Sequence, residues 1–367
     1  MWTNVSTHRK FISRLQNCKQ VSFAHRTQTN KPGRRLTMSH SYTIIAADIG
    51  GTNARFQAWA ISMEGVDDEL LFEKTYSTNS FDAFDKCLNV FCHDSGLDHF
   101  DSSCFAVAGP VENNCCEMTN LKWQVNGAQV QQSFNIPKVS VLNDFAAVGH
   151  GITGLDPSQL AKLNDIEPVQ HGPIAIVGPG TGLGEAFLIW NDANEAYSII
   201  STEGSHAPFA PKNEVQIELL KYMWAKNYKV CEVEQVCSGP GLRRIYEFLC
   251  KSIHTKPDDI EPAEIATRAL ANSCKTCRTT LKMFLEILGS ECSSAALRVL
   301  ATGGVYIAGG IPPKILPLLM DGSLTTAFEN CNPSMRNVVA SFPLIAVKTP
   351  NVGLLGAKVL AKRQLGD

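Results

Sequence analysis

The sequence has no excess of charge of one sign and no long apolar run. Its net charge is −2 at pH 7, and 19% of its 367 residues are charged. A membrane-spanning helix needs about 18 consecutive apolar residues, whereas nucleic acid and anionic membranes attract strongly basic surfaces. We therefore expect neither nucleic acid nor a membrane as a partner. The apolar content of 44% instead indicates a globular chain with a large core.

The sequence also lacks the cysteine pattern of a disulfide-stabilised protein. Its 13 cysteines are odd in number and are spread over predicted strands and helices. This distribution indicates reduced thiols in a reducing compartment. Cys274 and Cys277 have the spacing of a zinc-ligand pair, but no second Cys or His pair lies near them. We therefore predict no zinc site there.

Residues 1–41 contain no acidic residue. Eight Lys and Arg residues lie among many Ser and Thr residues in this segment, a composition typical of an organelle transit peptide. The alternatives are a disordered basic tail and translation that starts at Met38. In each case we expect the folded core to start at Tyr42.

Two common nucleotide-binding motifs are absent, namely GxxxxGK[ST] and a GxGxxG that leads from a strand into a helix. Instead, two glycine-rich turns each lie between apolar runs rich in β-forming residues: DIGGTN within Thr43–Trp59, and GPGTGLG within Pro173–Trp190. Glycine lets backbone N–H groups approach phosphate oxygens closely, and Thr52 and Thr181 add hydroxyl donors. One such turn is weak evidence, but two of them predict a site for the phosphates of a nucleotide.

The order of predicted elements repeats after each turn. Three strand-like runs, a helix and a further strand accompany the first turn, and the same order restarts at Ile174. We therefore predict an α/β fold with a duplicated β-β-β-α-β core, in which two domains enclose a cleft. The expected small domain is 42–150, completed by a terminal helix in 352–367, and the expected large domain is 151–351. Within the large domain we expect one long helical run over 262–300.

Asn143 and Asp144 follow a predicted buried strand, and ligands of open α/β sheets bind at the carboxyl ends of the strands. A carboxylate at this position can accept the proton of an attacking hydroxyl during phosphoryl transfer. Alternatively, Asp144 is the N-cap of the helix that follows it.

A second polar segment, Ser201–Pro211, places Glu203 and His206 three residues apart in a loop. A carboxylate and a neutral imidazole suit the hydroxyl groups of a ligand, because one accepts hydrogen bonds and the other donates them. An exposed polar loop is the alternative. Glu232 and Glu234, ahead of the sequence SGPG, also have a solvated surface as their alternative.

Six motifs together resemble the bacterial-type ATP-dependent glucokinases in order and spacing. They are DIGGTNAR, LNDF, GPGTGLGEAFL, EGSHAPFAP, SGPGL and GGVYIAGGI, and the resemblance runs from Thr43 into the terminal helix. It implies the actin-like, or ribonuclease H-like, fold, a homodimer, and transfer of a phosphoryl group from Mg²⁺·ATP to the 6-hydroxyl of glucose. Related sugar kinases and repressors often carry a Cys-x-Cys-Gly-x-x-Gly-Cys zinc motif. Its absence indicates the zinc-free branch.

The resemblance also implies roles for single residues. Asp144 resembles the catalytic base, and Asn143 resembles a sugar ligand. The other implied sugar ligands are Asn120, Glu203, His206 and Glu234. The implied nucleotide-binding residues are Asp48, Gly50, Gly51, Thr52 and Asn53 in the first turn, Gly180, Thr181 and Gly182 in the second turn, and Gly309 and Gly310 on the adenosine side. Asp48 is also expected to hold the metal ion through water.

Two other functions fit the same fold: a kinase for another hexose or an amino sugar, and a catalytically weak sugar-binding regulator. A DNA-binding repressor would need a helix-turn-helix ahead of the kinase core, and residues 1–41 are too few and too irregular for one. The presence of Asp144 with both phosphate-type turns favours catalysis. The cytoplasm is the expected location, with organellar import through residues 1–41 as the alternative.

Overall fold

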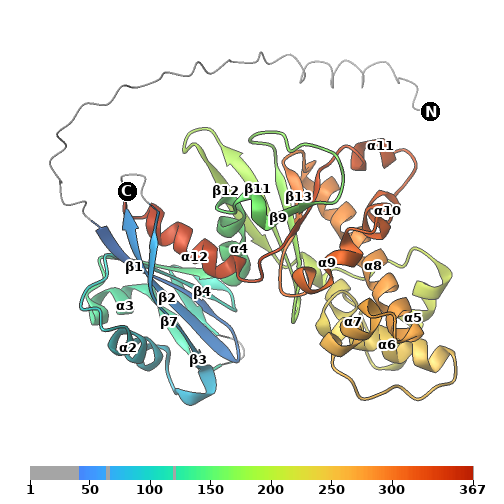
Figure 1. Cartoon of the computed structure of the whole chain (residues 1–367), viewed down its shortest axis with the longest axis horizontal. Coiled ribbons are helices and arrows are strands. Elements are labelled where there is room, and N and C mark those ends of the chain that lie inside the picture. Colours follow the sequence, from blue (N-terminus) through green and yellow to red (C-terminus); the bar gives the residue numbers. More distant parts are fainter. Residues whose placement is uncertain (1–40, 63–66, 119–120, 367) are drawn as a thin grey trace, which may run out of the picture. The chain divides into compact units, whose positions relative to one another are not determined.

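The computed structural model describes residues 41–62, 67–118 and 121–366. Within them the chain forms two large sheets and one small sheet (Figure 1). The first sheet has the strand order β3-β2-β1-β4-β8, and the second has the order β12-β11-β10-β13-β14-β9. The first five strands of each order have the same connectivity, so the predicted duplication is confirmed.

The bounds of the elements in the described residues are these. The first sheet contains β1 (Ser41–Ile49), β2 (Asn53–Ser62), β3 (Glu69–Ser77), β4 (Ser102–Val107) and β8 (Lys138–Asn143). The small sheet contains β5 (Val111–Glu112), β6 (Cys115–Glu117) and β7 (Gln124–Asn126). The second large sheet contains β9 (Leu160–Lys162), β10 (Ile174–Pro179), β11 (Leu183–Asn191), β12 (Ala196–Thr202), β13 (Gly304–Ile307) and β14 (Leu344–Val347). The α-helices are α2 (Phe84–Ser95), α3 (Gly127–Phe134), α4 (Asp144–Thr153), α5 (Glu214–Ala225), α6 (Gly239–Ser252), α7 (Pro262–Leu270), α8 (Lys275–Val299), α9 (Leu316–Leu319), α10 (Ser323–Glu329), α11 (Arg336–Val339) and α12 (Val352–Arg363). Short 3₁₀ helices are η1 (Thr78–Ser80), η2 (Pro157–Gln159), η3 (Gly204–His206), η4 (Val233–Gln235) and η5 (Pro312–Ile315).

In the first sheet, the carboxyl ends of three parallel strands meet at one edge. Ile49 of β1 pairs with Val107 of β4, and Val107 pairs with Asn143 of β8. The turn that starts at Gly50 and the helix that starts at Asp144 therefore leave the same end of the sheet, with β4 between their strands. This register brings two segments that are far apart in sequence to the end of the sheet where ligands of open α/β sheets bind.

The second sheet repeats this arrangement and adds an edge strand. β10 and β11 form an antiparallel hairpin, and β13 pairs with β10 in parallel, so that Ile307 lies opposite Val177. β9 pairs antiparallel with β14 at the edge of the sheet. Neither β9 nor the small sheet was predicted, because these strands are only two or three residues long and show no alternating pattern that can be recognised.

The terminal helix α12 packs on the first sheet and against α4 (Figure 1). Leu354, Ala357 and Ala361 of α12 form one apolar cluster with Ile44 of β1 and Ala106 of β4, and all of them are almost fully buried. Glycines let the two helices approach closely. A Cβ atom at Gly356 would lie 1.7 Å from the carbonyl oxygen of Ala147, and one at Gly151 would lie 2.2 Å from that of Val352.

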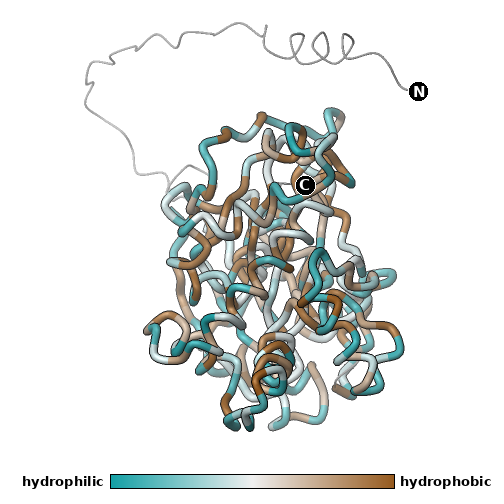
Figure 2. The backbone as a smooth tube through the Cα atoms, turned by 90° about the vertical axis from the view of Figure 1, so that its right-hand side faces the viewer, coloured by the Kyte–Doolittle hydropathy of each residue, from teal (hydrophilic) through white to brown (hydrophobic). Residues whose placement is uncertain are grey.

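The largest apolar cluster lies between the second sheet and the helices α5 to α10. Its members come from β10, β11, β13 and β14 and from the inward faces of these helices, and Figure 2 shows brown, apolar segments running through the interior of the fold. α8 passes through this cluster and is buried along most of its length. Among the described helices, none is long and apolar enough to cross a membrane.

The prediction of one helical run over 262–300 is wrong. α7 ends at Leu270, and α8 begins at Lys275. Between them Asn272 adopts a left-handed conformation, with φ of 53°. Cys274 is the N-cap of α8, and its Sγ accepts a hydrogen bond from the N–H of Cys277 at 3.4 Å. The Cys-Lys-Thr-Cys sequence thus marks a helix start.

The close approach of α4 and α12 gives a testable expectation for stability. Gly356→Ala should lower the free energy of unfolding by about 1–3 kcal/mol, because its Cβ atom would overlap the backbone of α4. Urea unfolding followed by circular dichroism measures this change.

Gly353→Ala is the matched control on the same helix. Its Cβ atom would find its nearest neighbour, the carbonyl oxygen of Asp144, at 3.7 Å, an ordinary contact. It should leave stability unchanged or raise it by roughly 0.5–1 kcal/mol, since alanine favours a helix over glycine. Equal effects of the two substitutions would contradict the close packing.

Candidate active site

The first glycine-rich turn, between β1 and β2, is held in place by backbone hydrogen bonds and by Thr78. The N–H of Gly50 donates to the carbonyl oxygen of Asn53 at 2.9 Å. Thr78, which is fully buried, donates its hydroxyl to the carbonyl oxygen of Gly51 at 2.8 Å and its N–H to that of Thr52 at 3.0 Å. Thr52 and Asn53 are exposed. The turn is therefore rigid and open to a ligand. Thr78 has no sequence signal beyond its position after β3, and sequence reasoning missed it.

The second glycine-rich turn is supported by Glu234. The N–H of Gly180 donates to the carbonyl oxygen of Gly182, and the N–H of Gly239 donates to that of Gly180, both at 2.8 Å. The Oε2 atom of Glu234 accepts a hydrogen bond from the N–H of Leu183 at 2.9 Å. A Cβ atom at Gly182 would lie 2.5 Å from the same carboxylate oxygen. Glu234, an expected sugar ligand, thus also fixes the phosphate-type turn.

The adenosine-side glycines lie beside this second turn. Gly309 has φ of 96°, a backbone conformation that favours glycine, and its Cβ atom would lie 2.7 Å from the carbonyl oxygen of Pro179. The N–H of Ile311 donates to the same oxygen at 3.2 Å. A Cβ atom at Gly180 would lie 3.8 Å from the N atom of Gly310. Two predicted nucleotide segments that are more than a hundred residues apart are therefore neighbours.

The helix cap at the end of β8 belongs to Asn143 and not to Asp144. The Oδ1 atom of Asn143 accepts hydrogen bonds from the N–H groups of Phe145 at 2.9 Å and Ala146 at 3.2 Å, and its Nδ2 donates to the carbonyl oxygen of Gly109. Asp144 is the first residue of α4. The alternative in which Asp144 serves as the N-cap is therefore wrong. Asn143 has a structural role in addition to the predicted sugar contact.

Phe145 connects the two large sheets next to Asp144. A Cβ atom at Gly178 of β10 would lie 2.4 Å from its ring, and one at Gly184 of β11 would lie 2.1 Å from it. The ring therefore packs closely against a strand pair that has no side chains at these two positions. This contact places the start of α4 against the hairpin that carries the second turn.

The pKa of Asp144 is raised to about 6. Burial is the main cause, and the charges of Asp48 and Glu203 add to it, whereas the hydrogen bond from the N–H of Phe145 opposes it. Burial also raises the pKa of Asp48, and the facing Arg55 on β2 opposes that shift. A carboxylate with a raised pKa is a stronger base than an ordinary one.

The loop after β12 brings two predicted sugar ligands together with Glu232. The Nδ1 atom of His206 lies 2.9 Å from the Oε2 of Glu232, and its Nε2 atom lies 3.6 Å from the Oε2 of Glu203. The hydrogen bond to Glu232 is the main reason that the pKa of His206 is raised. The side chains of Glu203 and His206 are 82% and 50% exposed. Both can therefore meet a ligand from solvent.

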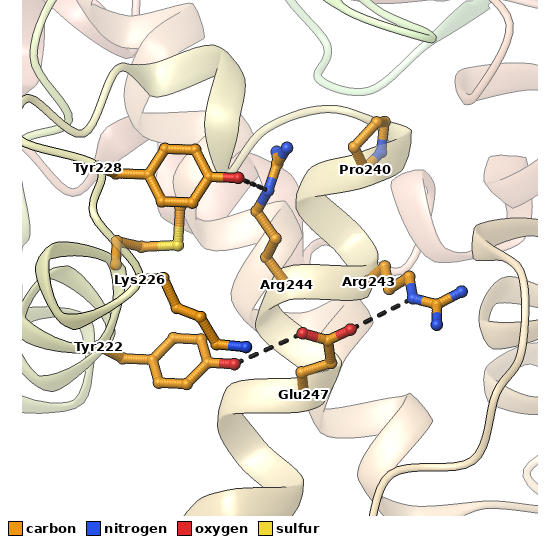
Figure 3. A pocket seen from close by; sticks show the side chains of 8 residues that line it. Tyr222, Lys226, Tyr228, Pro240, Arg243, Arg244 and Glu247 are labelled. Atoms are coloured by element: carbon orange, nitrogen blue, oxygen red, sulfur yellow. Dashed lines mark hydrogen bonds and ion pairs between the residues drawn. The ribbon is translucent and has the colours of Figure 1, made fainter.

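Asn120, another expected sugar ligand, lies outside the described residues. Among the described residues, no three His, Cys, Asp or Glu side chains are grouped closely enough to hold a metal ion by themselves. A pocket of about 240 Å³ lies beside α5 and α6 (Figure 3). It contains none of the expected site residues. Its lining residues are Tyr222, Met223, Lys226, Tyr228, Pro240, Arg243, Arg244 and Glu247.

Comparisons with known proteins identify the family of this chain. The model of the glucokinase family matches residues 45–364. The chain belongs to the glucokinase family. It is 36% identical to a glucokinase of Nostoc punctiforme over 342 residues, which cover 87% of this chain and 99% of the relative.

Solved structures of glucokinases share the fold. One from an Antarctic psychrotroph has a TM-score of 0.75 and 28% identity. The match covers 88% of this chain and 99% of the psychrotroph chain. One from Balamuthia mandrillaris, solved in complex with glucose, has a TM-score of 0.73 and 20% identity. The match covers 89% of this chain and 95% of the Balamuthia chain. The predicted fold class, the two-domain actin-like α/β fold, is therefore confirmed.

The different contacts of His206 and Glu234 predict different kinetic effects. His206→Ala should raise the Michaelis constant for glucose by roughly tenfold to a hundredfold and leave that for ATP within about twofold, since an unpaired buried hydroxyl costs about 1–3 kcal/mol. Glu234→Ala should raise both constants by roughly tenfold, because it also removes the acceptor for Leu183. Steady-state kinetics with each substrate varied in turn measures both effects.

Glu234→Gln is the control, because its amide oxygen can still accept the hydrogen bond from the N–H of Leu183. The Michaelis constant for ATP should therefore stay near the wild-type value in this variant. If Glu234→Ala changed only the constant for glucose, the contact with the second turn would have no part in nucleotide binding.

Proposed function

We propose that this protein is a glucokinase that transfers the γ-phosphoryl group of ATP to the 6-hydroxyl of glucose. The observation that carries the proposal is the position of Asp144. It starts the helix at the edge shared with the first turn, and Phe145 next to it packs on the hairpin that carries the second turn. Membership of the glucokinase family supports the same activity.

In this proposal, Asp144 orients the glucose hydroxyl and accepts its proton. Phosphoryl transfer proceeds through a loose transition state, so positioning contributes more than the strength of the base. A pKa of about 6 still leaves Asp144 mostly deprotonated at neutral pH, and the raised value makes it a better proton acceptor than an ordinary aspartate. Asn143, Glu203, His206 and, outside the described residues, Asn120 would bind the sugar.

The two turns would hold the phosphates of ATP. The first turn offers the hydroxyl of Thr52 and the side chain of Asn53, both exposed, and the second offers the exposed Thr181. Asp48 would hold Mg²⁺ through water, and its half-buried carboxylate, which forms no ion pair among the described residues, fits that role. When bound, Mg²⁺ neutralises charge on the β- and γ-phosphates.

Three further features belong to the proposal. The domains with expected bounds 42–150 and 151–351 would close over the bound sugar and exclude water, which competes for the γ-phosphate. The protein would form a homodimer and supply glucose 6-phosphate to glycolysis. We expect it to work in the cytoplasm, with organellar import through residues 1–41 as the alternative.

A coupled assay with purified protein tests the activity. Mg²⁺·ATP is supplied with glucose, with other hexoses and with amino sugars, and the release of ADP is followed. Glucose should give the highest kcat/KM. A higher value for another sugar would reassign the substrate. Binding of glucose without turnover would favour the alternative of a sugar-binding regulator.

The role of Asp144 predicts the effect of an isosteric substitution. Asp144→Asn should lower kcat by about 10²–10⁴-fold, because an amide cannot accept the proton, while glucose affinity by calorimetry stays within about tenfold. The same substitution should also change stability. Because folding raises the pKa of Asp144, its ionised form lowers the free energy of unfolding, and this cost is fully present above about pH 6. The uncharged variant should therefore melt at a higher temperature than the wild type at pH 7.5. A near-normal kcat would refute the role of Asp144 as base.

The same pKa predicts the pH profile of the wild type. Asp144 must be deprotonated to accept a proton, so kcat/KM should fall as the pH drops through about 6. Rates in buffers of constant ionic strength between pH 5 and 8 give this profile. A profile that is flat down to pH 5 would contradict the assignment.

A further inference from the structure

Glu185 is a fully buried carboxyl group directly after the second glycine-rich turn. It lies on β11, where side chains alternate between the two faces of the sheet. Gly184 faces Phe145, and Leu183 belongs to the large apolar cluster on the other face. Glu185 shares the face of Leu183. Its carboxyl group therefore points into the core and away from Asp144, and the proposed mechanism does not use it.

Glu185 shares one cationic group with a second carboxylate. The Nη1 atom of Arg298 donates hydrogen bonds to the Oε2 of Glu185 and to the Oε1 of Glu291, both at 3.1 Å. Glu291 is also close enough for its negative charge to act on Glu185. Two carboxylates beside one guanidinium leave one negative charge in excess, and a proton shared between the carboxyl groups removes it.

The surroundings of Glu185 favour its protonated form. Burial and the charge of Glu291 raise its pKa to about 7, while Arg298 opposes the shift. The other titratable groups that affect this cluster are Lys212, which the charge of Glu291 attracts, and the thiols of Cys237 and Cys292, whose pKa values burial raises well above normal. The thiols are neutral, so Lys212 is the one further charge among these three groups. The Oε1 atom of Glu185 has no hydrogen-bond partner among the described residues.

The loop that carries the predicted sugar ligands Glu203 and His206 packs against this carboxyl group. Gly204 is the first residue of η3, and a Cβ atom there would lie 2.3 Å from the Oε2 of Glu185. The hydroxyl of Thr202 donates to the carbonyl oxygen of Glu185 and accepts from the N–H of Gly204, both at 3.3 Å. The turn then continues to His206 and closes with a hydrogen bond from its N–H to the carbonyl oxygen of Glu203 at 3.1 Å.

We propose that Glu185 is a positioning residue for the sugar site: its carboxyl group, fixed by Glu291 and Arg298, sets the place of Gly204 and so the direction of Glu203 and His206. This inference rests on the proposed function, because it assumes that the loop with Glu203 and His206 binds glucose. A side chain that only fills the core would affect stability. A positioning residue must in addition change what Glu203 and His206 contact.

Glu185→Leu and Glu185→Gln separate these two roles. Leucine keeps the volume but loses the hydrogen bond from Arg298. The Michaelis constant for glucose should therefore rise roughly tenfold, with that for ATP within about twofold. Glutamine resembles the protonated acid: it can accept from Arg298 and donate to Glu291, and it should keep wild-type constants. Thr280→Val on α8 is the control, because it removes a fully buried hydroxyl away from the loop.

The titration of His206, followed by NMR in the absence of substrate, gives a readout that does not depend on activity. The bond to Glu232 raises the pKa of His206. Wild type, Glu185→Gln and Thr280→Val should therefore share one raised value, and Glu185→Leu should move it towards the normal value. Identical titration in all four proteins would overturn the proposal. Glucose turnover of the wild type tests the proposed function separately.

A double variant tests the contact with Gly204 directly. Gly204→Ala alone should raise the Michaelis constant for glucose about tenfold, because its Cβ atom meets the carboxyl group of Glu185. In the Glu185→Ala background the same substitution should have no further effect, since the obstructing atoms are gone. Effects of Gly204→Ala that are equal in the two backgrounds would show that Glu185 does not set the position of the loop.

Discussion

The contact of the Phe145 ring with Gly178 and Gly184 determines how the site is assembled. Asp144 and Phe145 are neighbours in the first turn of α4, so whatever fixes the ring also fixes the carboxylate. The strand pair offers a flat surface because two of its residues lack side chains, and an added Cβ atom at either would overlap the ring. This single aromatic contact thus fixes the position of Asp144, at the end of the first sheet, relative to the second glycine-rich turn on the second sheet.

The acidic character of the site has an energetic cost that function explains. Asp48, Asp144 and Glu203 lie close enough for the charges of the other two to raise the pKa of Asp144. A fold selected only for stability would avoid such a cluster, because burial and like charges both oppose ionisation. Active sites commonly retain groups of this kind. The phosphates of a nucleotide are also anionic, so a cation must accompany them into this environment.

The sequence predicted the parts of the fold and site that depend on local patterns. The two glycine-rich turns, the strand end before Asp144 and the terminal helix all follow from residue type and periodicity, and the structure contains each of them. The missing parts depend on contacts between distant segments. Nothing near Thr78 indicates that its hydroxyl binds Gly51, and nothing near Glu234 indicates the contact with Leu183.

The break in the predicted helix over 262–300 has a different cause. The residues from Ala271 to Cys274 are compatible with a helix, but Asn272 takes a left-handed conformation, which asparagine tolerates better than most residues. The role of each predicted site residue stays a prediction from resemblance. The geometry adds second roles for Asn143 as a helix cap and for Glu234 as a support of the second turn.

The packing of α12 on β1 and β4 has a consequence for how the protein folds during synthesis. The apolar face made by Ile44, Ala46 and Ala106 is covered by Leu354, Ala357 and Ala361, which leave the ribosome last among these residues. Chains generally fold from the amino end as they emerge. The first sheet can form early, but one of its faces stays open to water until α12 arrives. That face is where a chaperone would bind the growing chain, and its protection would be the last step of folding.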